Sequence, residues 1–197
     1  MCAFACTLFV CEDESLYAVG RPHTYNERWH DAYQSKRSWA AVNKPADCTD
    51  YKKVVASGSN FLILTKAGQL FCHGENLRLY FDSDVEKERA TTEFVNCTDL
   101  FPVDDGDQIV DVAAGYFHTL AVTEGGSAYA VGLDKYRSYY THIEGILDRK
   151  PAYQIELPGR AVACWAHKTT SVAWFAVEDD AGGRKMYSGC EFVDHYE

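Results

Sequence analysis

Residues 108–132 read Gln-Ile-Val-Asp-Val-Ala-Ala-Gly-Tyr-Phe-His-Thr-Leu-Ala-Val-Thr-Glu-Gly-Gly-Ser-Ala-Tyr-Ala-Val-Gly. Short runs of Val, Leu and Tyr bounded by Gly, Asp and Glu are typical of strands. Glu124-Gly125-Gly126-Ser127 predicts a tight hairpin turn, with a glycine where the backbone needs positive φ. Gly115 follows a strand and suggests a close backbone approach or a bulge. This stretch therefore predicts strand, glycine, strand, turn, strand.

The pattern recurs along the chain, which is the mark of a repeat architecture. Residues 7–20 match residues 119–132 without a gap, and residues 54–74 carry the same order of elements. Gly58 is aligned with Gly115 in that copy. A degraded fourth copy covers residues 160–189, where Trp165 is aligned with the same glycine and the turn Asp179–Arg184 is longer.

Another candidate strand precedes each later copy, at Trp39–Val42, Glu93–Cys97 and Ala152–Leu157. The copies end near Gly20, Gly74, Gly132 and Gly189, at spacings of 54, 58 and 57 residues. About four strands in each period are typical of a propeller blade. We predict an all-β fold and treat residues 1–197 as one propeller segment. A generic all-β domain with coincidental glycine spacing is the alternative.

The stretch from Gln108 to Thr123 resembles the repeat of the regulator of chromosome condensation family. The family pattern runs V-x-x-V-A-x-G-x-x-H-T-x-A-L-T, then G, then V-Y-x-W-G. The resemblance covers nearly the whole chain, is strongest in Ile109–Gly132 and is weakest after Cys164. The family's Trp before the closing glycine is replaced by Val19, His73 and Val131.

The resemblance implies a seven-bladed propeller, of which this chain holds about three and a half repeats. We therefore expect a partial β-propeller of about three to four four-stranded blades, an open arc rather than a closed seven-blade ring. Such an arc leaves strand edges unpaired and apolar faces half covered. A partner chain, a second copy, or the rest of a longer gene product could complete it. We favour assembly with protein partners, as other subunits of a complex or a second propeller half.

The resemblance also implies a function, because many family members are scaffolds. We predict a non-enzymatic protein-interaction scaffold that is completed by, or docked in, a larger protein assembly. The alternative is a guanine-nucleotide exchange factor or regulator of a small GTPase, which is the activity of the founding member. None of the loop residues needed for exchange can be matched in this sequence.

No catalytic constellation is present in the sequence. The eight cysteines form no C-x-x-C pair, and the seven histidines form no H-x-H or H-E-x-x-H. His118 falls at the recurrent histidine of the family, which is a structural position, and Cys72 and His73 point to opposite faces of a strand. The acidic stretches Asp104–Asp107 and Glu178–Gly183 are predicted to be solvated turns. We predict no catalytic, cofactor-binding or metal-binding residues and no cofactor.

The loops between repeats carry the candidate contact residues. Residues 21–39 and 135–140 interleave Arg and Lys with Tyr and Trp, a composition typical of protein interfaces. Our candidate partner contacts are Trp29, Trp39, Tyr136, Arg137 and Tyr139. These side chains also suit packing of outer strands onto the blades, or stacking on single-stranded nucleic acid. The formal net charge of 19 − 29 = −10 makes nucleic acid an improbable partner.

Nothing in the sequence indicates secretion or membrane insertion. The first basic residue is Arg21, so no positive segment precedes an apolar one. The apolar run Cys2–Cys11 is too short to span a bilayer. We expect a cytoplasmic protein, with cytoskeletal, ciliary or nuclear association as variants of that location, and cysteines that are mostly reduced and buried.

Overall fold

The computed structural model describes residues 6–20, 40–57, 60–74, 93–115, 118–132, 152–167 and 173–188. Within them the regular elements are strands and one 3-10 turn, η2 (Thr98–Leu100). The first seven strands are β1 (Cys6–Val10), β2 (Leu16–Gly20), β3 (Ala40–Ala41), β4 (Tyr51–Ser57), β5 (Asn60–Thr65), β6 (Leu70–His73) and β7 (Val95–Asn96). The others are β8 (Ile109–Ala114), β9 (His118–Thr123), β10 (Ala128–Gly132), β11 (Tyr153–Ile155), β12 (Arg160–Ala166), β13 (Ala173–Glu178) and β14 (Arg184–Ser188).

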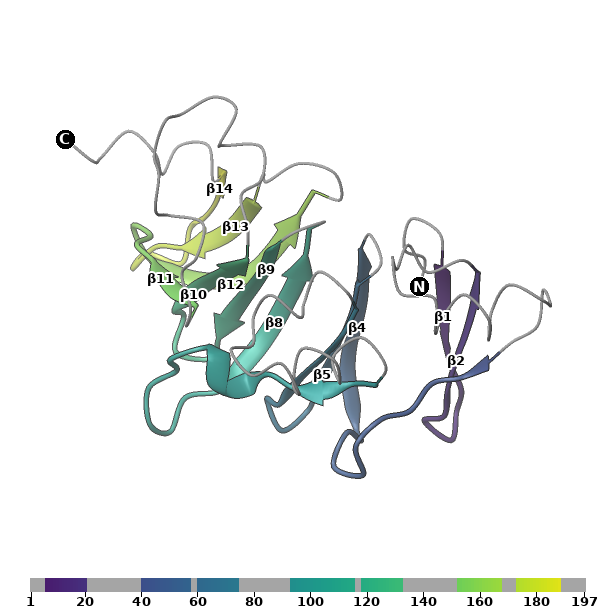
Figure 1. Cartoon of the computed structure of the whole chain (residues 1–197). Helices are drawn as coiled ribbons and strands as arrows, with labels where there is room; N and C mark the ends of the chain where they lie inside the picture. Colours follow the sequence, from purple (N-terminus) through teal and green to yellow (C-terminus); the bar gives the residue numbers. More distant parts are fainter. Residues whose placement is uncertain are drawn as a thin grey trace. The chain divides into compact units, whose positions relative to one another are not determined.

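The strands form four antiparallel sheets in sequence order (Figure 1). Sheet A has the order β1-β2-β3, sheet B β4-β5-β6-β7, sheet C β11-β10-β9-β8, and sheet D β12-β13-β14. The predicted all-β fold is confirmed. Sheets B and C are four-stranded as predicted for a blade, whereas sheets A and D have three strands each within the described residues. The outer strands β3, β7 and β11 lie inside the three segments predicted for them.

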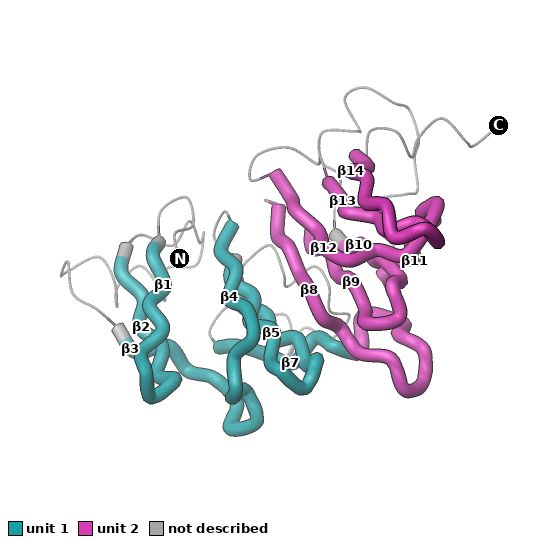
Figure 2. Tube along the Cα trace, turned by 180° about the vertical axis from the view of Figure 1, so that it is seen from behind, with its two compact units in different colours: residues 1–98 teal, residues 99–197 magenta. Residues whose placement is uncertain are grey.

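The chain divides into two compact units, residues 1–98 and residues 99–197 (Figure 2). Unit 1 holds sheets A and B, and unit 2 holds sheets C and D. Each unit has a core of its own between its two sheets. No helix in the described part of the chain is long and apolar enough to cross a membrane.

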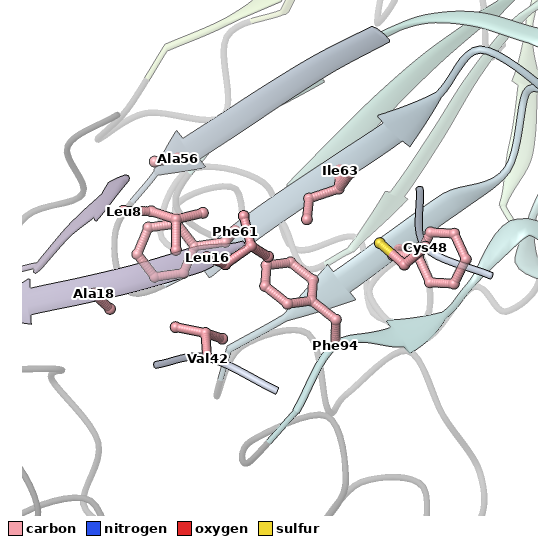
Figure 3. Close-up of a cluster of buried hydrophobic side chains, with 10 residues drawn as sticks. Leu8, Leu16, Ala18, Val42, Cys48, Ala56, Phe61, Ile63 and Phe94 are labelled. Atoms are coloured by element: carbon pink, nitrogen blue, oxygen red, sulfur yellow. The ribbon is translucent and has the colours of Figure 1, made fainter. Parts of the chain in front are cut away.

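The core of unit 1 joins one face of sheet A to one face of sheet B (Figure 3). Alternate residues of a strand point to opposite faces, and the core residues of β1, β2, β5 and β6 all come from one face of each strand. Sheet A contributes Leu8, Leu16, Ala18 and Val42; sheet B and its flanking segments contribute Cys48, Ala56, Phe61, Ile63, Phe71 and Phe94. All ten are at most 9% exposed, which fixes the register of both hairpins, since a slip of one residue would expose the apolar set.

The core of unit 2 repeats this arrangement with different residues. Sheet C contributes Ala113, Leu120, Val122, Ala128 and Ala130; sheet D contributes Ala161, Cys164, Ala173, Phe175 and Val177. A polar contact accompanies the packing, because the Cys164 N–H donates to Asp111 Oδ2 at 3.0 Å. The same layering of consecutive sheets therefore occurs in both units.

Each of the four hairpins is closed by the same five-residue turn. The N–H of its first residue donates to the carbonyl of the fifth, and the N–H of the fourth donates to the carbonyl of the first. The turns are Cys11–Ser15, Thr65–Gln69, Thr123–Ser127 and Asp179–Gly183. The fourth residue has positive φ in every copy: 61° at Glu14, 77° at Gly68, 96° at Gly126 and 77° at Gly182. The predicted turn glycines are confirmed, and the first copy uses a glutamate in their place.

The ladders correct two details of the predicted repeat alignment. An unpaired bulge residue lies near the start of β4, β8 and β12, between Tyr51 and Lys53, Ile109 and Asp111, and Ala161 and Ala163. Counting from this shared bulge, Ser57 rather than Gly58 is equivalent to Gly115. In the fourth copy His167, and not Trp165, takes that position.

The fourth turn is also not longer, contrary to the prediction. The pairs Val177–Lys185 and Glu178–Arg184 lengthen the ladder between β13 and β14, and the turn beyond them keeps its five residues. The extra residues therefore extend β13 and β14 rather than the turn.

Candidate interaction surface

The five predicted contact residues, Trp29, Trp39, Tyr136, Arg137 and Tyr139, all lie outside the described residues. Their proposed role therefore stays a prediction. The described residues point to a different surface, formed by sheet faces rather than by loops.

Every sheet has two faces that can be compared position by position between copies. We call one of them the trailing face; it carries Leu8 and Leu16 in sheet A, and Leu120 and Ala128 in sheet C. The opposite face, which carries Phe71 in sheet B and Phe175 in sheet D, is the leading face. In unit 1 the trailing face of A packs on the leading face of B, and in unit 2 the trailing face of C packs on the leading face of D.

The leading face of sheet A is exposed and apolar. It carries Thr7, Phe9, Tyr17 and Val19, in which Phe9 pairs with Tyr17 across the ladder and Thr7 pairs with Val19. Phe9 is 39% exposed and Tyr17 is 37% exposed. Their equivalents in sheet B, Ile63 and Phe71, are 0% exposed, and Tyr129 in sheet C is 2% exposed. Sheet A thus presents to solvent two positions that are buried in sheets B and C.

The trailing face of sheet D is exposed in the same way. Trp165 pairs with Trp174 and Ala176 pairs with Met186, so these side chains share one face. Trp165 is 48% exposed and Met186 is 57% exposed. The equivalents of Met186 in the other sheets are at most 2% exposed; they are Leu16, Leu70 and Ala128. Trp174 is half-buried and meets the His167 ring edge-on, with 6.3 Å between centroids.

Both exposed faces are almost free of charge. The described charged residues at positions of the D face are Arg160, Glu178 and Arg184, all at its turn end; Glu178 and Arg184 lie 3.8 Å apart. Burying such a surface against a partner costs little desolvation of charge. Contiguous exposed apolar surface of this kind marks interaction sites in folded proteins.

The histidines that invited a chemical role are used for structure. His73 Nδ1 lies 3.2 Å from the carbonyl oxygen of Glu93, and its ring stacks on Phe61 and contacts Phe94. The ring of His118 lies over Gly115, where a Cβ atom would overlap it.

The described thiols are mostly buried, as predicted: Cys48, Cys72, Cys97 and Cys164 are buried, and Cys11 is exposed. Burial raises the pKa of Cys48 to about 12. Burial, together with a hydrogen bond that the Cys97 thiol donates to Cys72, raises the pKa of Cys97 well above its ordinary value. Thiols in such surroundings are unreactive at neutral pH, because the thiolate is the nucleophile.

The predicted acidic turns use their carboxylates internally. Asp107 accepts hydrogen bonds from the N–H groups of Gln108 and Gly125, both at 2.8 Å. Asp179 accepts from Ala181 and Gly183 at 3.1 and 2.7 Å. In the described part of the chain, no three or more His, Cys, Asp and Glu residues are grouped so that they could hold a metal ion.

Comparison with known proteins identifies the repeat and the fold. Residues 109–137 match the model of the regulator of chromosome condensation (RCC1) repeat. The structure of human WBSCR16 superposes with a TM-score of 0.66 at 16% identity, covering 89% of this chain and 43% of that one. No curated protein sequence matches the chain.

Prp20p from Saccharomyces cerevisiae, studied with its binding properties to Gsp1p and histones, gives a TM-score of 0.57 at 16% identity. That match covers 93% of this chain and 43% of Prp20p. Yeast RCC1 (Prp20) bound to Kap60 gives a TM-score of 0.58 at 17% identity, covering 95% and 42%. The chain thus contains the predicted type of repeat and has the partial propeller fold. It spans less than half the length of the propellers that it matches.

Proposed function

We propose that this chain is a non-enzymatic protein-interaction module, a partial propeller that docks other proteins on the exposed faces of sheets A and D. The observation that carries the proposal is the exposure of Phe9, Tyr17 and Met186 at repeat positions that are buried in sheets B and C. Both faces are apolar, and contiguous exposed apolar surface is typical of interaction sites.

The matched propellers support a protein partner. Prp20p is described by its binding to Gsp1p and histones, and a second structure shows it bound to Kap60. At 16–17% identity this likeness concerns the fold, so the partners of our chain are a proposal in their own right. We place its assembly in the cytoplasm, the location we expected from the sequence.

The experiment is native mass spectrometry of the tagged chain isolated from its source cells. We expect one or more proteins in stoichiometric ratio with the 22.1 kDa chain. Replacing Phe9 and Met186 by aspartate should release them, since a charge would be buried without a partner. Tyr153→Asp is the matched control, because Tyr153 is 41% exposed but lies on β11 of sheet C. A bare monomer, or companions that survive the double substitution, would contradict the proposal.

Guanine-nucleotide exchange on a small GTPase is the alternative function, and the interaction of Prp20p with Gsp1p is the observation that favours it. The distinguishing measurement is release of labelled nucleotide from a panel of GTPases. We expect no acceleration by the chain at substoichiometric amounts. Acceleration that survives Phe9→Asp would favour the exchange function over docking on the sheet faces.

A further inference from the structure

We infer that the leading face of sheet A binds the trailing face of sheet D in a second copy of this chain. The inference rests on the proposed function and names the partner for the exposed faces. The contact is head to tail: each copy offers one face of each kind, so the same two faces recur at every junction.

The two units show which faces belong together. In unit 1 the trailing residues Leu8, Leu16 and Ala18 meet the leading residues Ile63 and Phe71. In unit 2 the trailing residues Leu120 and Val122 meet the leading residues Phe175 and Val177. Both contacts join a trailing face to a leading face. The chain exposes one leading face, on sheet A, and one trailing face, on sheet D.

The residues that would meet at a junction between two copies occupy the same repeat positions as the residues that join the two sheets inside each unit. Phe9 is equivalent to Ile63 and Phe175, and Tyr17 is equivalent to Phe71, all of which lie in the cores. On the other side, Trp174 is equivalent to Leu8 and Leu120, which also lie in the cores. A junction between copies would therefore reuse the chain's own sheet-on-sheet packing.

The chemistry of both faces suits a junction between proteins. Aromatic side chains and methionine are enriched in the centres of protein interfaces, and charged residues are depleted there. The leading face of A carries Thr7, Phe9, Tyr17 and Val19, and the trailing face of D carries Ala163, Trp165, Trp174, Ala176 and Met186. Neither set contains a charge that would be stranded on burial.

The way in which propellers cover their sheets favours a second copy. A propeller protects its sheets by radial repetition, so that each sheet face meets that of a neighbour. A second copy presents both required faces. A head-to-tail contact either closes into a ring or continues into a filament, depending on the rotation it imposes.

The test uses purified full-length chain with two face variants, Phe9→Asp for sheet A and Met186→Asp for sheet D. Molar mass is measured by light scattering after gel filtration over a range of concentrations. We expect the wild type to self-associate and each variant alone to be monomeric, with the dissociation constant raised roughly 30-fold or more, as for a central interface residue.

Mixing the two variants is the decisive step. The intact D face of the Phe9→Asp chain should bind the intact A face of the Met186→Asp chain, giving a 1:1 heterodimer that grows no further. Tyr153→Asp should associate like the wild type, and circular dichroism should show the strand signal in every variant.

Other outcomes overturn the inference in distinguishable ways. If Met186→Asp still dimerises alone and mixing restores nothing, the A face binds itself. If the purified wild type is monomeric but isolates from its source with a different protein released by Phe9→Asp and Met186→Asp, the self-contact is wrong and the proposed function stands. If the wild type is monomeric in both preparations, the inference and the proposed function both fail.

Discussion

Glu14, Gly68, Gly126 and Gly182 occupy one turn position, and three of the four are glycine because φ there lies between 61° and 96°. An L-residue pays for this left-handed backbone with a cost on the order of 1 kcal/mol. At Glu14 this cost is offset by other contacts of the residue. Its Oε1 accepts the Asp50 N–H at 2.6 Å, and its carbonyl accepts the Tyr51 hydroxyl at 2.9 Å. A local strain in sheet A is thereby tied to the start of sheet B.

The two turn glycines of unit 2 should respond differently to alanine. Gly182 has open space where a Cβ would go, whereas a Cβ at Gly126 would meet Arg160, including its Cα at 3.2 Å. We expect Gly182→Ala to lower the free energy of unfolding by about 1 kcal/mol, the backbone cost alone. Gly126→Ala should cost about 1–3 kcal/mol more, through crowding of β12. Urea denaturation measures both, and equal losses would contradict the steric argument.

Asp107 should confer a pH dependence on the stability of unit 2. Partial burial raises its pKa, but hydrogen bonds from the Thr123 side chain and from nearby N–H groups, including that of Gly125, lower it by more. The net shift is downward from 3.8, so the native state favours the carboxylate. This stability is present above the unfolded-state pKa and is lost as the pH falls through the lowered native value.

We therefore expect Asp107→Asn to reduce stability at pH 7 and to flatten its decline below about pH 4. Asp105→Asn, an exposed aspartate in the same loop, is the control and should leave the profile unchanged. The measurement is the urea midpoint between pH 7 and pH 3. An unaltered slope in Asp107→Asn would show that its hydrogen bonds carry no net free energy.

At the scale of the element, the junction of β8 and β9 explains why Gly115 is a glycine. Its N–H donates to the His118 carbonyl at 2.8 Å, and the His118 ring fills the place of a side chain. Ser57 and Asn60 stand at the equivalent positions in sheet B and are likewise paired. Sheet C thus pairs Gly115 with the large residue His118, and sheet B pairs the larger Ser57 with the smaller Asn60.

Exchange between the copies tests this compensation. Gly115→Ser should lower the free energy of unfolding by about 1–3 kcal/mol, because its Cβ overlaps the imidazole. Adding His118→Asn should recover part of the loss, so that the double variant is more stable than Gly115→Ser. His118→Asn alone is the matched control for the cycle. Additive losses would mean that the ring and the glycine act independently.

The elements and their order could be predicted from the sequence because both rest on local pattern. The alternation in residues 118–132 and the turn glycines are sufficient to predict the strands, the turn between them and the pairing of the two strands. Exact equivalence between copies could not be predicted, because a bulge residue such as Val110 leaves no compositional mark, and the extra pair Glu178–Arg184 looks like part of a loop.

The exposed faces were missed for a related reason. Phe9 and Trp165 look like ordinary core residues when each strand is considered alone. Only comparison of the folded copies shows the difference: Ile63 and Ala121, the equivalents of Phe9, are 0% exposed, whereas Phe9 is 39% exposed. The contacts predicted from the sequence fall in the aromatic loops at 21–39 and 135–140, which lie outside the described residues.

For the whole molecule, net charge sets how association should respond to salt. Two copies with a formal charge of −10 each repel one another, while their proposed contact faces are nearly uncharged. Salt shortens the reach of the repulsion from about 10 Å at 0.1 M to about 3 Å at 1 M and leaves apolar contact intact. We therefore expect self-association to tighten as NaCl rises from 0.1 to 1 M, measured by sedimentation equilibrium.

The opposite response would identify another kind of partner. Nucleic-acid binding releases counterions and weakens steeply with salt. A contact dominated by ion pairs between proteins would weaken too, because exposed charges are screened. Tyr153→Asp makes each copy one charge more negative without touching either face, so it should steepen the salt response, whereas Phe9→Asp should abolish association at every salt concentration. Association that weakens between 0.1 and 1 M NaCl would contradict apolar docking of sheet faces.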